Sequence, residues 1–234
     1  MTKPHNMWPA GKLPKDFQRK ELDELREAGY DWKDPRDAIG MFERKIAKFA
    51  GSKYAILVDC CSNGLFLCMK YLKATGEIRI PAKTYVSVPM QIMHAGCTAK
   101  FEDVEWSGVY QMKPYPLYDS AVRWRKGMFV GGDDSLQVIS FQIKKRIPIG
   151  RGGVILMDSK EAYDWLNLAR YDGRDLSLPY NHPEHFKAIG YHMYMTPEDA
   201  ARGIMLMDKV GEDIYEDTGS SKTYPDISGM KIFR

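Results

Sequence analysis

The stretch Tyr54–Gly64, YAILVDCCSNG, runs from a short apolar segment directly into the start of a helix. Tyr54–Val58 has the length and the β-branched and aromatic content of a buried strand. Ser62 is a residue type that caps helices, and a helical pattern follows it as far as Lys73. A strand that passes straight into a helix predicts one β-α unit of an α/β fold.

The same alternation of strands and helices extends in both directions along the chain. Upstream, apolar residues recur at helical spacing between Asp34, which is placed to cap the helix, and Gly51, which ends it. Downstream, strands are predicted within 78–80, 99–104, 115–119, 138–141 and 154–157, and helices within 86–94, 159–170 and 196–210. This rhythm predicts an α/β domain with a mainly parallel sheet that helices cover on both faces.

Polar segments that contain proline flank the predicted domain. Residues 1–34 predict an N-terminal arm with a short helix within 17–28. Residues 35–210 form the α/β domain, and residues 211–234, polar with Gly, Ser and Pro, predict a C-terminal surface tail. We therefore expect a single domain with two appendages.

The composition of the chain argues against several classes of protein. Its 234 residues are 44% apolar, which is enough for a packed core. The 34 basic and 31 acidic residues give a net charge of +3, which does not call for a nucleic-acid partner. No apolar run reaches the roughly 18 residues of a membrane helix, and the N-terminus lacks a signal peptide, so we expect a cytoplasmic protein. The cysteines at 60, 61, 68 and 97 form no C-x-x-C pair and predict reduced thiols.

The segment Ser140–Gly153, SFQIKKRIPIGRGG, leaves a predicted strand, passes Lys144 and Lys145, and enters a glycine-rich turn. Side chains that follow the carboxyl end of a parallel strand project into the crevice where α/β proteins bind ligands. A lysine that is partly desolvated there binds its proton less tightly and becomes competent to form a Schiff base. The alternative is a basic hairpin that faces solvent, and the segment alone does not decide between the two.

Three further segments carry candidate ligand-binding groups. The helix start at Ser62 offers free amides to an anion, although ordinary capping explains Ser62 equally well. Asp119 ends an apolar strand, where its carboxylate can pair with a protonated ring nitrogen or cap a helix. Tyr85 lies just past a strand end and suits either stacking on a flat ring or packing in the core.

Taken in order, these segments resemble the DegT/DnrJ/EryC1/StrS family of sugar aminotransferases that depend on pyridoxal phosphate (PLP). The matching residues are Phe42-Glu43, Phe49–Gly51, Tyr54–Val58, Ser62–Leu65, Pro81–Tyr85, Ala95-Gly96, Asp119–Ala121, Ser140–Gln142, Lys145, Gly152-Gly153, Arg170–Gly173, Gly190-Tyr191, Ala200-Ala201 and Gly203. The resemblance implies a large domain like that of fold-type-I PLP-dependent transferases. It also implies a C-terminally shortened chain, because family members continue into a small domain after the position of Val210.

The resemblance implies roles for single residues. Lys145, five residues after Ser140, falls at the Schiff-base position and would shuttle a proton during transfer. Asp119 matches the acid that keeps the pyridine nitrogen protonated, and Tyr85 matches the aromatic that stacks on the ring. The implied cofactor-binding residues are Lys145, Asp119, Tyr85, Ser62, Asn63, Ser140 and His192. His192 would donate to a phosphate across a dimer, with a packed or solvent-facing histidine as the alternative.

The chain departs from the family pattern at four positions. Val122 stands where a Gln or His commonly contacts the cofactor, and Arg151 replaces an acid before the paired glycines. His192 and Tyr194 replace an Asn and an Arg in the segment that reaches into the neighbouring subunit's site.

The function that the resemblance implies is transfer of an amino group, from glutamate, to a keto-sugar carried on a nucleoside diphosphate. The enzyme would be a homodimer with shared active sites, acting in the synthesis of surface glycans or related sugars. Two alternatives stay open: a PLP enzyme of another reaction type, such as dehydration, and a non-catalytic homologue that acts as a partner subunit. No metal site is expected, because His182 and His185 have no evident third ligand. No membrane partner is expected either.

Overall fold

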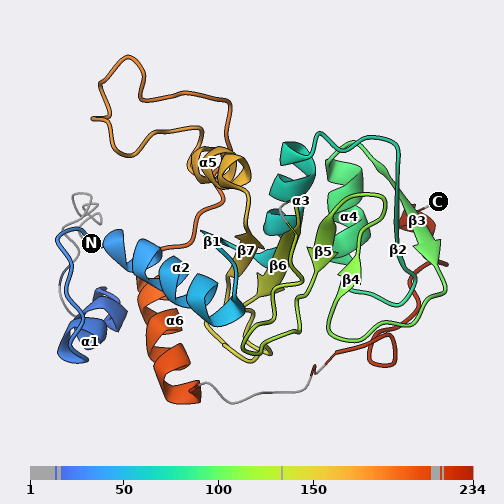
Figure 1. Ribbon diagram of the computed structural model, residues 1–234, viewed down its shortest axis with the longest axis horizontal. Helices are drawn as coiled ribbons and strands as arrows, with labels where there is room; N and C mark the ends of the chain where they lie inside the picture. Colours follow the sequence, from blue (N-terminus) through green and yellow to red (C-terminus); the bar gives the residue numbers. More distant parts are fainter. Residues whose placement is uncertain (1–13, 15–16, 133, 212–216, 218, 234) are drawn as a thin grey trace, which may run out of the picture.

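A five-stranded sheet with the strand order β1-β7-β6-β5-β4 lies at the centre of the molecule (Figure 1). The computed structural model describes residues 14, 17–132, 134–211, 217 and 219–233. The strands are Tyr54–Val58 (β1), Tyr110–Gln111 (β4), Leu117–Asp119 (β5), Leu136–Ser140 (β6) and Gly153–Met157 (β7). A separate parallel pair joins Glu77–Pro81 (β2) to Thr98–Glu102 (β3).

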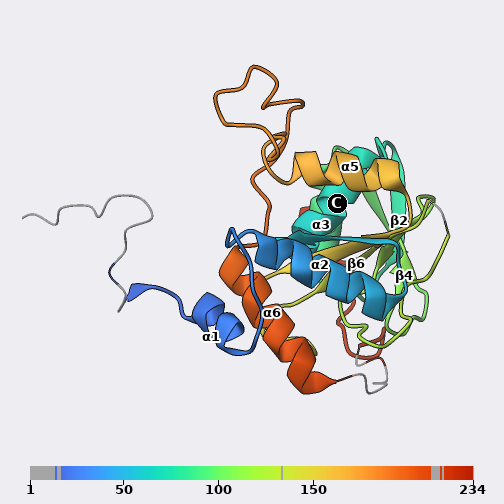
Figure 2. The same ribbon diagram turned by 60° about the vertical axis from the view of Figure 1, so that its left-hand side comes forward.

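Helices cover both faces of the central sheet (Figure 2). One layer holds Asp37–Ala50 (α2) and Pro197–Val210 (α6), with Glu21–Glu27 (α1) against α6; the other holds Cys61–Tyr71 (α3), Ser87–His94 (α4) and Lys160–Ala169 (α5). Strand side chains alternate between the layers, so that Leu57 packs with α2 and α6 while Ile56 and Val58 pack with α3. The predicted α/β fold with helices on both faces is confirmed.

The strands of the central sheet run in mixed directions, whereas the sequence predicted a mainly parallel sheet. β5 and β6 are parallel, but β7 is antiparallel to both β6 and β1, and β4 is antiparallel to β5. Parallel neighbours need a long crossover connection, usually a helix, over the face of the sheet. The connection 141–152 between β6 and β7 contains no helix and turns back on itself, so β7 returns beside β6 in the opposite direction.

A buried ion pair ties α2, β1 and the end of α5 together. Arg170 Nη1 lies 2.5 Å from Glu43 Oε1 and donates to the carbonyl oxygen of Leu57 at 2.7 Å. The Leu57 amide in turn donates to Glu43 Oε1 at 2.9 Å. Both charges are therefore compensated inside the core, and β1 is fixed where it leads into α3.

The first turn of α3 lies close to β7 and to the start of α4. Cys60 Sγ accepts a hydrogen bond from the Asn63 amide at 3.4 Å, so Cys60 and not Ser62 caps the helix. Ser62 Oγ instead lies 2.6 Å from Ser87 Oγ at the start of α4. A Cβ added at Gly153 would lie 2.7 Å from the Cys61 amide nitrogen, so only glycine permits this approach of α3 to β7.

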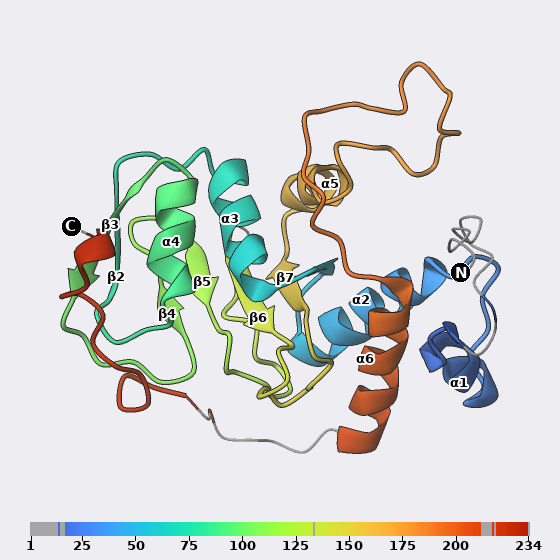
Figure 3. The same cartoon turned by 180° about the vertical axis from the view of Figure 1, so that it is seen from behind.

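Residues 219–233 of the predicted C-terminal tail cross back over the molecule (Figure 3). The Gly108 amide donates to the carbonyl oxygen of Gly219 at 2.8 Å, and the Ile227 amide donates to that of Ala82 at 3.0 Å. Ile227 is buried, and the segment ends in a short 3-10 helix, Lys231–Phe233, beside β3. Backbone hydrogen bonds anchor this segment, which its polar composition does not indicate. Residues 212–216, 218 and 234 of the predicted tail, and 1–13 and 15–16 of the predicted arm, lie outside the described residues.

The connection 171–195 between α5 and α6 extends away from the body of the molecule (Figures 1 and 2). Its outer part exposes large apolar side chains: Tyr180 is 74% exposed, and Ile189 is 95% exposed. The inner part returns to the body, where the Asp59 amide donates to the carbonyl oxygen of Met193 at 2.9 Å.

Candidate active site

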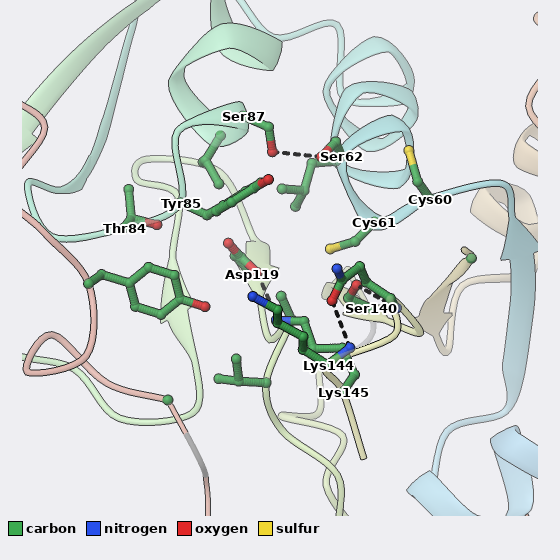
Figure 4. Close-up of a pocket in the computed structure, with 18 of the residues that line it drawn as sticks. Cys60, Cys61, Ser62, Thr84, Tyr85, Ser87, Asp119, Ser140, Lys144 and Lys145 are labelled. Atoms are coloured by element: carbon green, nitrogen blue, oxygen red, sulfur yellow. Dashed lines mark hydrogen bonds between the residues drawn. The ribbon is translucent and has the colours of Figure 1, made fainter. Parts of the chain in front are cut away.

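The carboxyl ends of β5 and β6 open onto a pocket of about 680 Å³. The two strands are parallel neighbours, so their last residues, Asp119 and Ser140, lie at the same edge of the sheet. The start of α3, the loop after β2 and the connection 141–152 form further walls (Figure 4). Five of the seven predicted cofactor-binding residues line this pocket, namely Lys145, Asp119, Tyr85, Ser62 and Ser140.

The Asp119 carboxylate is buried, with 6% of the residue exposed. The Tyr110 hydroxyl donates to Oδ2 at 2.6 Å, and the Ala121 amide donates to Oδ1 at 3.0 Å. Thr84 Oγ1 lies 2.6 Å from the Tyr110 oxygen, so the phenol is itself held in place. Burial raises the pKa of Asp119, while Tyr110, the Ala121 amide and the charge of Lys145 oppose that rise. Burial also raises the pKa of Tyr110 well above its ordinary value, which keeps the phenol protonated as a donor.

Lys145 reaches the same pocket from the turn that follows β6. Gln142 builds this turn, because its carbonyl oxygen accepts from the Lys145 amide at 2.8 Å and its Oε1 accepts from the Lys144 amide at 2.9 Å. Burial raises the pKa of the Cys61 thiol well above its ordinary value, and the positive charge of Lys145 opposes this rise, as it does at Asp119. The Lys145 ammonium therefore lies within electrostatic range of both side chains. Figure 4 shows Lys145, Asp119 and Cys61 around one central space.

Aromatic and hydroxyl groups form other parts of the pocket. Tyr85, 59% exposed, projects from the loop after β2. The hydroxyls of Ser62 and Ser87 meet where α3 and α4 begin, and Figure 4 marks the bond between them. Ser140 Oγ accepts from the Gln142 amide at 3.3 Å at the carboxyl end of β6. Hydroxyl groups and free helix amides thus lie near one another and can receive an anionic group.

Asn63 and His192 do not line the pocket. Asn63 Nδ2 donates to both carboxylate oxygens of Asp59, at 2.9 and 3.0 Å. The His192 side chain is 70% exposed, and its Nδ1 lies 3.1 Å from Asp172 Oδ2. Within this subunit the structure therefore brings neither side chain to Lys145.

The pocket also contains groups that sequence patterns did not indicate as site residues. Tyr224 lies far along the chain in the predicted tail. Tyr110 does not line the pocket but donates to Asp119 from behind it, and its two-residue strand is too short for any periodicity. Cys61 lies in an apolar stretch that predicts only a buried thiol. Arg151 Nη2 donates to Asp59 Oδ2 at 2.8 Å at the edge of the pocket. Among these residues only Arg151 could be singled out from the sequence, because it stands where the family pattern has an acid.

This arrangement can bind a planar ligand that carries a reactive carbonyl group and an anionic group. A primary amine adds to a carbonyl carbon, and a buried carboxylate pairs with a protonated ring nitrogen. Among the described side chains, no group of three His, Cys, Asp or Glu residues is arranged to hold a metal ion. In the same part of the chain, no helix combines the length and the apolar character that a membrane crossing requires.

The fold and the pocket define an α/β protein with a lysine and a buried carboxylate at the carboxyl ends of neighbouring strands. The chain belongs to the DegT/DnrJ/EryC1/StrS aminotransferase family, because the family model matches residues 15–115 and 122–226. The matched ranges include Tyr85, Ser140 and Lys145. Asp119 lies in the short stretch between the two matched ranges, so its place among the candidate site residues rests on the geometry of the pocket.

Similarity to individual proteins is distant and covers most of this chain. Spore coat polysaccharide biosynthesis protein SpsC of Bacillus subtilis (strain 168) is 23% identical over 243 residues, which is 82% of this chain and 61% of that protein. A putative PLP-dependent aminotransferase from Bacillus cereus shares the fold with a TM-score of 0.65 at 20% identity, over 86% of this chain and 66% of that one. DesI, solved in the presence of its TDP-sugar product, shares it with a TM-score of 0.61 at 18% identity, over 82% of this chain and 57% of that one. The chain thus spans about three-fifths of the length of its curated relative, and the solved structures establish the fold.

Proposed function

We propose that this chain is a PLP-dependent aminotransferase that moves an amino group, from glutamate, to a keto-sugar linked to a nucleotide. One observation carries the proposal: Lys145, in the turn after β6, and Asp119, at the end of the neighbouring β5, line the same pocket. Membership of the aminotransferase family supports the reaction class. The shared fold with the B. cereus PLP-dependent aminotransferase supports the cofactor.

The residues of the pocket fit PLP in size and in chemistry. Its volume of about 680 Å³ lies within the roughly 300–1,000 Å³ of small-molecule sites. Asp119 is a buried carboxylate that two donors orient, and the exposed ring of Tyr85 offers a stacking face. Ser62, Ser140 and the free amides that begin α3 offer donors to a phosphate. We keep Asn63 in this set through its place in the first turn of α3, and His192 as a donor to the partner subunit's site.

The residues of the chain have separate tasks in this reaction. Bound PLP supplies an electron sink for the negative charge that develops when a substrate carbon loses its proton. Lys145 Nζ would hold the cofactor and would accept and return the substrate's proton as general base and acid. Asp119 would keep the ring nitrogen protonated, and the donors from Tyr110 and Ala121 hold its carboxylate in place.

Two observations support a nucleotide-linked sugar as the amino acceptor. SpsC is named for the synthesis of spore coat polysaccharide, and DesI was solved with a TDP-sugar product. The pocket also carries the cationic side chains of Lys144 and Arg151, which suit the phosphates of a nucleotide or the carboxylates of glutamate. We therefore propose a role in the synthesis of a surface glycan or a related sugar.

We further propose a homodimer that acts in the cytoplasm. The projecting connection 171–195 exposes Tyr180, Phe186 and Ile189, and exposed apolar side chains on one segment suit burial against a second copy of the chain. The family resemblance assigns the same segment to the neighbouring subunit's site. All four cysteines are free, which supports a reducing compartment.

An amino-transfer assay tests the proposal. Protein loaded with PLP, glutamate and a nucleotide-linked keto-sugar should release 2-oxoglutarate in step with the amino-sugar product. Lys145→Ala should lower this rate by about 10³-fold or more, because it removes the amine that holds the cofactor and moves the proton. Lys160→Ala, at an exposed position on α5 outside the pocket, is the control and should keep the wild-type rate. Sugar turnover without release of 2-oxoglutarate would indicate dehydration instead, and equal rates in Lys145→Ala and Lys160→Ala would refute the assignment.

A further inference from the structure

The segment Gly219–Ile227, which we name the C-terminal wall, is seated on the loops that follow β2 and β3. The Ser221 amide donates to the carbonyl oxygen of Trp106 at 3.0 Å, between the anchors at Gly219 and Ile227. Just before the wall, Asp217 forms two contacts with the guanidinium of Arg123, at 2.8 and 3.1 Å. Between these anchors, Gly219, Thr223 and Tyr224 line the pocket that holds Lys145 and Asp119. The wall is therefore a fixed part of the candidate active site.

Packing fixes the ring of Tyr224 within this wall. Its centroid lies 5.6 Å from that of Trp106, and the Trp106 ring lies 4.9 Å from Tyr110, the donor to Asp119. Trp106 Nε1 donates to the carbonyl oxygen of Lys83 at 2.8 Å, which holds the middle ring of this series. Three aromatic rings thus connect the wall to the buried carboxylate.

Tyr224 lines the pocket, and its side chain is partly buried there. Burial raises the pKa of Tyr224, and the Asp119 carboxylate adds to the rise, so the phenol stays protonated as a donor. None of the described residues forms a hydrogen bond with this hydroxyl. A partly buried hydroxyl without a protein partner is a ready donor to a bound molecule.

Charged and neutral groups occupy different walls of the pocket. The cations Lys144, Lys145 and Arg151 all belong to the connection between β6 and β7. Among the described residues that line the pocket, those of the C-terminal wall and of the loops beneath it are neutral. They are Thr84, Tyr85, Trp106, Gly219, Thr223 and Tyr224. A carboxylate or phosphate suits the first wall, whereas aromatic faces with neutral hydroxyls suit an uncharged ring that carries several hydroxyl groups.

We propose that the C-terminal wall binds the sugar ring of the acceptor, with the Tyr224 hydroxyl donating to a hydroxyl oxygen of that sugar. This inference rests on the proposed function and names the part of the site that selects the sugar. The nucleotide phosphates and the carboxylates of the amino donor then belong to the opposite, cationic wall. Tyr224 is a specificity-determining residue in this arrangement.

The test separates the contribution of the sugar to binding from that of the nucleotide. Calorimetry on PLP-loaded protein gives Kd for UDP, GDP and TDP and for their glucose-linked forms, and the ratio of the two values measures the sugar contribution. The wild type should prefer at least one glucose-linked form over its bare nucleotide. Tyr224→Phe should lower that preference about fivefold, because it removes one neutral hydrogen bond, and should leave the Kd of the bare nucleotide unchanged.

Tyr163→Phe is the matched control, because Tyr163 is also half-buried, lies on α5 outside the pocket, and donates its hydroxyl to none of the described residues. Hydrogen exchange at the Ser221 and Ile227 amides checks that the wall stays seated in each variant. The inference is overturned if the wild type binds no glucose-linked form more tightly than its bare nucleotide, or if Tyr224→Phe keeps the wild-type preference. It is also overturned if Tyr224→Phe weakens the binding of glutamate and not that of the sugar. The visible absorbance of lysine-bound PLP, recorded on the same samples, reports separately on the proposed function.

Discussion

The Asp119 carboxylate combines burial with two donors, and the balance between them sets its protonation. Burial favours the neutral acid, whereas the Tyr110 hydroxyl and the Ala121 amide favour the carboxylate. A carboxylate that holds a protonated ring nitrogen must remain charged at working pH. Tyr110, which sequence patterns do not mark, is therefore a positioning residue that also keeps Asp119 ionised.

Tyr110→Phe should move the acid side of the rate profile to higher pH. Without the phenol donor the pKa of Asp119 rises further, so more of the acid is protonated at a given pH and less enzyme is competent. We expect kcat/KM at pH 7 to fall about tenfold and to recover partly at higher pH. The measurement is kcat/KM against pH for the variant, the wild type and Tyr163→Phe. A profile that drops equally at every pH would assign Tyr110 a merely structural role.

At the scale of elements, the site depends on how closely α3 approaches β7. A Cβ at Gly153 would meet backbone atoms of Cys60 and Cys61 at less than 3.0 Å, and backbone cannot move aside as a flexible side chain does. The start of α3 provides the free amides that we assign to the phosphate. A single methyl group at Gly153 therefore links stability to cofactor binding.

Gly153→Ala should both destabilise the fold and weaken PLP binding. Overpacking of this kind lowers the free energy of unfolding by about 1–3 kcal/mol, and the displaced start of α3 raises the Kd for PLP. Urea unfolding and a PLP titration measure the two effects. Gly229→Ala is the control, because a Cβ there meets nothing within 4 Å. If the two variants behave alike, the close packing of α3 on β7 does not control the site.

Strand composition and helix-capping residues predicted the elements that do not depend on contacts with distant parts of the chain. β1 has the predicted bounds, and α6 begins as predicted, with Thr196 Oγ1 accepting from the Asp199 amide at 3.3 Å. The predicted cap at Asp34 is not formed, because its carboxylate accepts from the Arg36 amide and α2 begins at Asp37. β4 has only two residues and forms through its pairing with β5, so hydrophobic periodicity does not predict it.

The same physical distinction separates the predicted from the unpredicted parts of the site. Lys145 and Asp119 follow strand ends, a local pattern that places side chains at the ligand-binding edge of an α/β sheet. Strand pairing places Tyr110 beside Asp119, and backbone anchors between distant parts of the chain bring Tyr224 to the pocket. Such contacts depend on the whole fold, and hydrophobic periodicity does not encode them.

At the scale of the whole molecule, we predict a dimer that depends on the projecting connection between α5 and α6. The double change Phe186→Glu with Ile189→Glu should give a folded monomer, because both side chains are exposed within one subunit and only the dimer interface would bury the new charges. Ile232→Glu, at an exposed position outside this connection, is the control and should leave the dimer intact. Light scattering after size exclusion measures the mass. A monomeric wild type, or a double variant that stays dimeric, would argue against the shared site.

The most direct test of the central claim is reduction of the PLP-loaded protein with borohydride, followed by fragmentation mass spectrometry. We predict one pyridoxyl group attached to Lys145 Nζ, and no label in Lys145→Ala. Attachment to Lys144 or to another lysine, or a protein that stays colourless and takes up no PLP, would contradict the account.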